Sequence, residues 1–124
     1  MPNNPFVHAE LVTPDLAKAK QFYQSLFDWK YNDVMGGEYT IIDVGEHKYG
    51  VGGGMLTTPE PGIPPHWFPY VAVSDLAAST EKAKSLGATV IKDITKIEGS
   101  ESSFSIIMDP AGAVLGLYSG GGDM

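Results

Sequence analysis

The sequence predicts an α+β fold built from two β-α-β-β-β modules with mainly antiparallel strands curved around a central cavity. Two observations support this fold class. The order of apolar strands and amphipathic helices repeats along the chain, and the 15 glycines and nine prolines fall at the boundaries of these elements. Strictly alternating single strands and helices, as in a doubly wound sheet, are absent.

The repeat is seen when Asp15 is placed over Asp75. Residues 11–17 then align with residues 71–77, and in both copies a short apolar strand leads into a polar residue and an amphipathic helix. Between the copies, the proline-rich residues 59–65 predict a stiff linker, because proline restricts φ and removes a backbone donor. We therefore expect a first module at 1–58 and a second at 66–124, together forming one compact domain.

Each helix has a predicted start and an apolar face. We expect Thr13 and Ser74 to be the N-caps, and Gly87 to end the second helix in a left-handed conformation. Helical spacing in the first helix predicts one stripe that faces the core: Leu16, Ala19, Phe22, Tyr23 and Leu26. The strands expected after the helices are 29–34, 39–44 and 49–55 in the first module, and 90–97, 104–108 and 114–118 in the second.

Composition excludes several classes of function. The net charge is −7 and no Lys/Arg cluster offsets it, which disfavours nucleic-acid binding. There are no cysteines, so disulfides, thiolate metal sites and cysteine nucleophiles are excluded. The apolar runs are too short to span a bilayer, and the first residues lack the pattern of an export signal. We expect a cytoplasmic protein without membrane partners.

Side-chain alternation along the two opening strands separates two faces. The aliphatic odd-numbered residues are expected to pack under the helices. The opposite face then carries an imidazole, a carboxylate, a phenol and aromatic rings, which suit a small-molecule pocket: His8, Glu10, His66, Phe68 and Tyr70.

Structural roles compete with these functional ones. His8 near a strand start also fits a surface or hydrogen-bonded structural histidine, and Glu10 fits an edge-strand or interface salt bridge. Trp67 fits an anchor of a core or interface. The glycines at 50–54 are not followed by a helix pattern, so a phosphate loop is disfavoured. A strand that lets another backbone or a ligand approach closely is the better interpretation.

Three stretches carry a resemblance to a known family: residues 8–29, with Phe22-Tyr23 on the helix; residues 67–88; and residues 109–117, with an Asp-Pro-x-Gly turn. They resemble the vicinal oxygen chelate superfamily of glyoxalase I, bleomycin-resistance proteins and extradiol dioxygenases. The resemblance implies paired βαβββ modules around a cavity that is often completed by dimerisation.

The resemblance also implies four metal-ligand positions in metal-dependent members, of which only His8 is kept here. Phe68 and Gly116 stand at two others, and the fourth falls in the glycine-rich residues 50–55. One imidazole does not make a metal site, so we expect no metal and no cofactor. The sequence is similar to the metal-free, glyoxalase-like branch.

The leading hypothesis is a small organic ligand bound in the cavity between the modules, with catalysis left open. In an enzyme, Glu10 would be the general base of lyase or isomerase chemistry, His8 would orient it, and Tyr70 could donate to a developing oxyanion. The ligand contacts would come from Phe68, Tyr70, His66, Trp67 and Gly116.

Two alternatives remain open. One is a metal-dependent lyase or dioxygenase with a rearranged site of His8, Glu10 and His66. The other is a non-enzymatic, sequestering resistance protein that stacks its ligand on aromatic rings. In all three cases we expect a homodimer, because two helices cannot cover eight short strands and because Trp67 and Phe68 would be exposed in a monomer.

Overall fold

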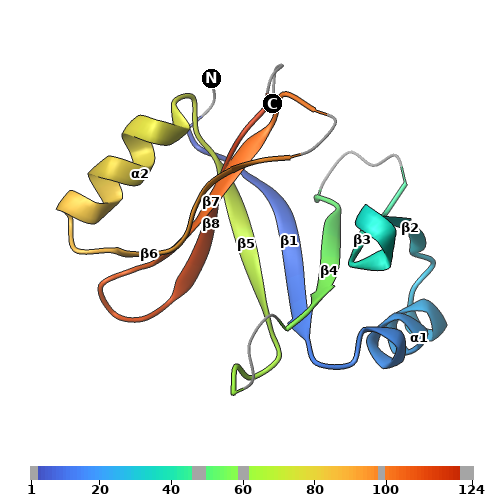
Figure 1. Cartoon of the computed structure of the whole chain (residues 1–124). Helices are drawn as coiled ribbons and strands as arrows, with labels where there is room; N and C mark the ends of the chain where they lie inside the picture. The colour runs from blue at the N-terminus through green and yellow to red at the C-terminus, as the bar shows by residue number, and fades with distance from the viewer. Residues whose placement is uncertain (1–2, 46–49, 59–61, 98–99, 121–124) are drawn as a thin grey trace. The chain divides into compact units, whose positions relative to one another are not determined.

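The computed structural model of the chain describes residues 3–45, 50–58, 62–97 and 100–120 (Figure 1). Two compact units are present: His8–Trp67 forms one, and the described parts of Met1–Val7 and Phe68–Met124 form the other. Residues 59–61 of the expected linker and residue 49 of an expected strand lie outside the described residues. Among the described residues, no helix combines the length and the apolar character needed to cross a membrane.

The unit His8–Trp67 contains most of the first β-α-β-β-β set. The elements of this set in chain order are β1 (Phe6–Thr13), α1 (Leu16–Leu26), β2 (Lys30–Val34), a short 3-10 turn (Met35–Gly37), β3 (Tyr39–Asp43) and β4 (Gly53–Thr57). The strand order is β2-β3-β4-β1. β1 pairs with β4 in parallel, and the other two pairings are antiparallel.

The second set repeats this arrangement. Its elements are β5 (His66–Ala72), α2 (Leu76–Ser85), β6 (Thr89–Lys96), β7 (Ser103–Met108) and β8 (Val114–Ser119), in the strand order β5-β8-β7-β6. β5 pairs with β8 in parallel, and α2 packs along β6, β7 and β8 (Figure 1). The predicted α+β class with two βαβββ sets is therefore confirmed.

The two helices begin at equivalent aspartates, as the repeat predicts. The Asp15 carboxylate accepts the backbone N–H of Lys18 at 3.0 Å, and the Asp75 carboxylate accepts that of Ala78 at 3.0 Å. The aspartates are the N-caps, so the assignment of Thr13 and Ser74 to this role was wrong. The reason is that each carboxylate reaches the backbone donor three residues ahead.

Each unit has its own hydrophobic core under its helix. In the first unit, Leu11, Ile42 and Met55 are buried, and Leu16 and Tyr23 of α1 pack against them. In the second, the buried residues are Val73, Leu76, Ile107 and Leu117. The odd-numbered residues Leu11 and Val73 therefore face the helices, as side-chain alternation predicts.

The apolar stripe of α1 is only partly buried. Phe22 and Leu26 are 59% and 58% exposed, so their assignment to the core was wrong. An α-helix turns by about 100° per residue, which places these two side chains beside the row formed by Leu16, Ala19 and Tyr23. That row alone packs against the core.

Candidate functional site

The hydroxyl of Tyr39 joins the side chains of His8 and Glu10. It donates to Oε1 of Glu10 at 2.9 Å and lies 2.8 Å from Nε2 of His8. Nε2 and Oε1 themselves are 3.6 Å apart, so the hydroxyl lies between them. These three residues form the His8–Tyr39–Glu10 group, which lies within one unit.

Strand alternation brings the group to one face of the sheet. On β1, Leu11 packs under α1, so His8 and Glu10 face the opposite side. On β3, Ile42 belongs to the same core, so Tyr39 also faces away from α1. The carboxylate is buried, with Glu10 only 7% exposed, and a buried carboxylate needs hydrogen-bond donors.

The direction of the hydrogen bonds follows from the state of the phenol. Burial, and then the negative charge of Glu10, raise the pKa of Tyr39 far above its ordinary value, so the phenol keeps its proton. That single proton is donated to Glu10. His8 must therefore donate its Nε2–H to the Tyr39 oxygen, and a chain of donors runs from the imidazole to the carboxylate.

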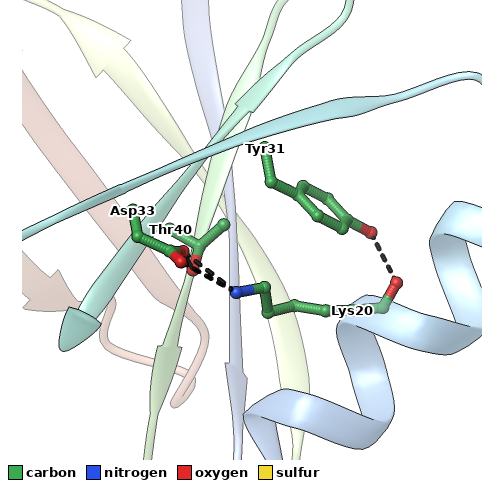
Figure 2. Close-up of polar contacts among 4 residues, drawn as sticks. All are labelled: Lys20, Tyr31, Asp33 and Thr40. Atoms are coloured by element: carbon green, nitrogen blue, oxygen red, sulfur yellow. Dashed lines mark hydrogen bonds and ion pairs between the residues drawn. The ribbon is translucent and has the colours of Figure 1, made fainter.

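A network on the other face of β3 holds this strand in register (Figure 2). Asp33 of β2 pairs with Thr40 of β3, and the Thr40 hydroxyl donates to its carboxylate at 2.7 Å. Lys20 of α1 reaches the same carboxylate at 2.9 Å, and Tyr31 donates to the Lys20 carbonyl at 2.8 Å. Thr40 and then Lys20 hold the pKa of Asp33 below its usual value. Because Tyr39 directly precedes Thr40, the network also fixes the backbone position from which the Tyr39 side chain extends.

The glycine-rich strand makes room for close neighbours, as its sequence predicts. A Cβ on Gly53 would lie 2.1 Å from the backbone oxygen of Ala9. A Cβ on Gly54 would lie within the van der Waals radius of the Tyr39 hydroxyl. Gly53 thus leaves space for the β1 backbone, and Gly54 leaves space for the Tyr39 ring.

In the second unit, the predicted ligand contacts Phe68 and Tyr70 are buried and pack together, with ring centroids 5.4 Å apart. The Tyr70 ring also packs edge-on against Phe104 and fills the space over Gly116. Phe68 is 5% exposed, so the expectation of an exposed Phe68 was wrong. Its ring is covered because it packs against the neighbouring tyrosine ring on the same face of β5.

The other two predicted ligand contacts lie on the first residues of β5. Trp67 is 40% exposed and packs in an aromatic cluster with Tyr23 and Trp29, and its indole N–H donates to the Tyr23 hydroxyl at 3.2 Å. Nδ1 of His66 lies 2.8 Å from the carbonyl oxygen of Pro64.

Tyr39 is the site residue that sequence reasoning missed. The sequence predicts it only as the first residue of the strand at 39–44. The signal that could have found it is the pair of glycines in the neighbouring strand, because a strand glycine often marks the close approach of another group.

The residues present do not fit a metal ion at the four positions that the resemblance implies. In the first unit, the Tyr39 ring occupies the space above Gly54, which is paired with Glu10. In the second, the Tyr70 ring occupies the space above Gly116, with which it is paired. Within the described ranges, no three His, Asp or Glu side chains come together in a way that could hold a metal.

Adding Mn²⁺, Ni²⁺ or Zn²⁺ to the purified chain is expected to leave its thermal midpoint unchanged. A ligand that binds only the folded state raises the midpoint, and one imidazole with one carboxylate gives too few donors for useful affinity. Differential scanning fluorimetry with each metal, and with a chelator as the control, measures this. A rise that saturates at one equivalent of metal would contradict the prediction.

Comparison with known proteins places this geometry in context. Residues 6–117 match the family described as Glyoxalase/Bleomycin resistance protein/Dioxygenase superfamily. "Putative glyoxylase CFP32" of Mycobacterium tuberculosis is 34% identical over 113 residues, which cover 88% of this chain and 43% of that protein. The anthracycline biosynthesis protein DnrV of Streptomyces peucetius is 28% identical over 126 residues, covering 90% and 46%. The chain thus spans less than half the length of these curated relatives.

Solved structures share the fold at low sequence identity. Methylmalonyl-CoA epimerase from Mycobacterium tuberculosis has a TM-score of 0.68 at 14% identity and covers 94% of this chain and 88% of that one. The Mn(II)-bound glyoxalase from Novosphingobium aromaticivorans has a TM-score of 0.67 at 17% identity, and the match covers 92% of this chain and 37% of that one. At such identities the likeness concerns the fold alone.

Proposed function

Because the chain belongs to the glyoxalase/bleomycin resistance protein/dioxygenase superfamily, we propose that it binds a small carbonyl compound at the His8–Tyr39–Glu10 group. The proposed chemistry is metal-independent proton transfer at the carbon next to the carbonyl, as in isomerases and lyases. The observation that carries the proposal is the buried Glu10 carboxylate, which accepts a hydrogen bond from the Tyr39 hydroxyl at 2.9 Å.

Each residue has a distinct part in this proposal. Glu10 accepts the proton: the C–H bond breaks, an O–H bond forms on the carboxyl group, and the electron pair moves to the carbonyl oxygen. Tyr39 orients the carboxylate and remains protonated because of its raised pKa. His8 donates to the Tyr39 oxygen and keeps the phenol proton directed at Glu10.

The fate of the proton determines the reaction. Its return to the other face of the same carbon is epimerisation, the reaction named for several structural neighbours. Its return to another atom is isomerisation, and loss of a leaving group makes the reaction a lyase.

The experiment has two steps. Thermal-shift screening against 2-oxo acids, hydroxy ketones and acyl thioesters identifies ligands that stabilise the folded chain. Proton NMR in D₂O then follows exchange of the ligand's C–H next to the carbonyl. We expect Glu10→Gln to keep binding and to slow this exchange by about 100-fold or more, because general-base catalysis contributes roughly that factor.

Glu38→Gln is the matched control, because Glu38 is an exposed carboxylate directly before Tyr39. It should exchange the ligand proton at the wild-type rate. Binding without exchange in the wild type would exclude proton transfer and favour sequestration. Equal slowing by both substitutions would remove Glu10 as the base.

A second candidate function is non-catalytic binding of an aromatic ligand by stacking. The exposed Trp67 favours it, since its ring packs edge-on against Tyr23 at 5.5 Å and Trp29 at 6.2 Å and presents an aromatic surface. A ligand of this kind should quench tryptophan fluorescence in the wild type, and Trp67→Leu should weaken its binding.

The cytoplasmic homodimer stays a prediction, and sedimentation at micromolar concentration tests its assembly.

A further inference from the structure

Gly54 lies directly beneath the hydroxyl of Tyr39. It is the register partner of Glu10 in the β1–β4 pairing. A Cβ built at this position would overlap the Tyr39 oxygen and would lie 2.2 Å from Cζ and 2.8 Å from Cε2. The ring can therefore lie over β4 and reach Glu10 only because residue 54 has no side chain.

We propose that Gly54 is a positioning residue for the His8–Tyr39–Glu10 group, an inference that rests on the proposed function of that group. Because residue 54 has no side chain, the Tyr39 ring can lie over β4. In that position its hydroxyl lies between Nε2 of His8 and Oε1 of Glu10. Gly54 acts through Tyr39 and touches neither a ligand nor the transferred proton.

The second unit also places a tyrosine ring over a strand glycine, but there the ring comes from the register partner of that glycine. Gly116 is the register partner of Tyr70, and its Cβ would lie 2.2 Å from the Tyr70 ring. There the ring packs against Phe68 and Phe104, in an aromatic setting. In the first unit, by contrast, the tyrosine over the glycine has its hydroxyl between an imidazole and a carboxylate.

The atoms that a new Cβ would meet determine what a substitution does. At Gly54 they belong to the far end of a side chain, which can swing away, so Gly54→Ala should fold and displace the hydroxyl. At Gly53 the Cβ would meet the backbone oxygen of Ala9 at 2.1 Å, which can move only with β1. Gly53→Ala is therefore a control whose damage does not depend on the Tyr39 ring.

The experiment compares Gly54→Ala, Tyr39→Phe, Tyr39→Ala and the double variant Gly54→Ala/Tyr39→Ala, with Gly53→Ala and Gly53→Ala/Tyr39→Ala as controls. Nitrogen-15 NMR of the His8 imidazole reports the hydrogen bond at Nε2, and absorbance near the tyrosinate band reports ionisation of Tyr39. We expect Gly54→Ala to shift the His8 signal in the same direction as Tyr39→Phe. It should also return the ionisation of Tyr39 toward the pH of an ordinary tyrosine.

Thermal midpoints test the coupling between the two residues. Gly54→Ala should lower the midpoint in the wild-type background and have little effect in the Tyr39→Ala background, where the ring is absent. Gly53→Ala should lower it equally in both. If Gly54→Ala alone does not fold, recovery of folding in the double variant supports the proposal, and failure of the double variant contradicts it.

An unchanged His8 signal and unchanged Tyr39 ionisation in folded Gly54→Ala would overturn the proposal. Equal losses of midpoint in both backgrounds would overturn it as well. None of these measurements needs a ligand. A failed ligand search combined with coupled His8 and Gly54 signals would therefore reject the proposed function while leaving the positioning role intact.

Discussion

Tyr39→Phe is expected to lower the free energy of unfolding by about 1–3 kcal/mol, because it removes a hydrogen bond from a buried carboxylate. The hydroxyl serves two buried or half-buried partners, Oε1 of Glu10 at 2.9 Å and Nε2 of His8 at 2.8 Å. Phenylalanine keeps the ring over Gly54 but removes both bonds. Urea unfolding measured near neutral pH gives the difference.

Tyr31→Phe is the matched control. The Tyr31 hydroxyl donates to the backbone carbonyl of Lys20 at 2.8 Å, so the same substitution removes one bond to a neutral acceptor (Figure 2). Tyr31→Phe should lower the free energy of unfolding by about 0.5–1.5 kcal/mol, the net contribution of an ordinary hydrogen bond. If Tyr39→Phe lowers the free energy of unfolding by no more than Tyr31→Phe does, the hydrogen bond from the phenol to Glu10 contributes no more than an ordinary hydrogen bond.

The elements of the fold could be predicted because each has a local signal. The repeat around Asp15 and Asp75 marks the two helix starts, and strand alternation assigns Leu11 and Val73 to the helix side. Both signals arise from residues close together in the sequence. A capping aspartate contacts a backbone N–H three residues ahead, and alternation needs only one strand.

The site was only half predictable, because its key contact is not local. His8 and Glu10 lie on β1, but the hydroxyl between them comes from Tyr39, 31 and 29 residues away. Its position depends on the pairing of β3 with β4 and on a glycine in β4. A sequence shows that glycine strands allow close approach, but it does not show which ring takes the space.

The expected exposure of apolar side chains failed for a similar reason. Phe22 and Leu26 fit the helical stripe, but only the row of Leu16 and Tyr23 reaches the core. Phe68 was expected at an open rim and is instead covered beside Tyr70. Periodicity defines an apolar face, and the width of the surface beneath it decides how much of that face is buried.

Alkaline pH is expected to remove the stabilising contribution of Tyr39. Burial and the charge of Glu10 raise the pKa of Tyr39 above the ordinary value of 10.0, so the folded chain holds the phenol proton more tightly than the unfolded chain. The contribution is therefore fully present below about pH 10. It falls as the pH rises further, by up to about 1.4 kcal/mol per pH unit.

The difference in unfolding free energy between wild type and Tyr39→Phe isolates this effect, because the other titrating groups are common to both chains. Tyr31 also has a raised pKa, from burial and from Tyr23, and it cancels in the comparison. Urea unfolding from about pH 8 to about pH 11 should show the wild-type advantage shrinking above about pH 10. A constant advantage across that range would mean that the phenol proton is held no more tightly in the folded chain, and the donor chain from His8 to Glu10 would lose its basis.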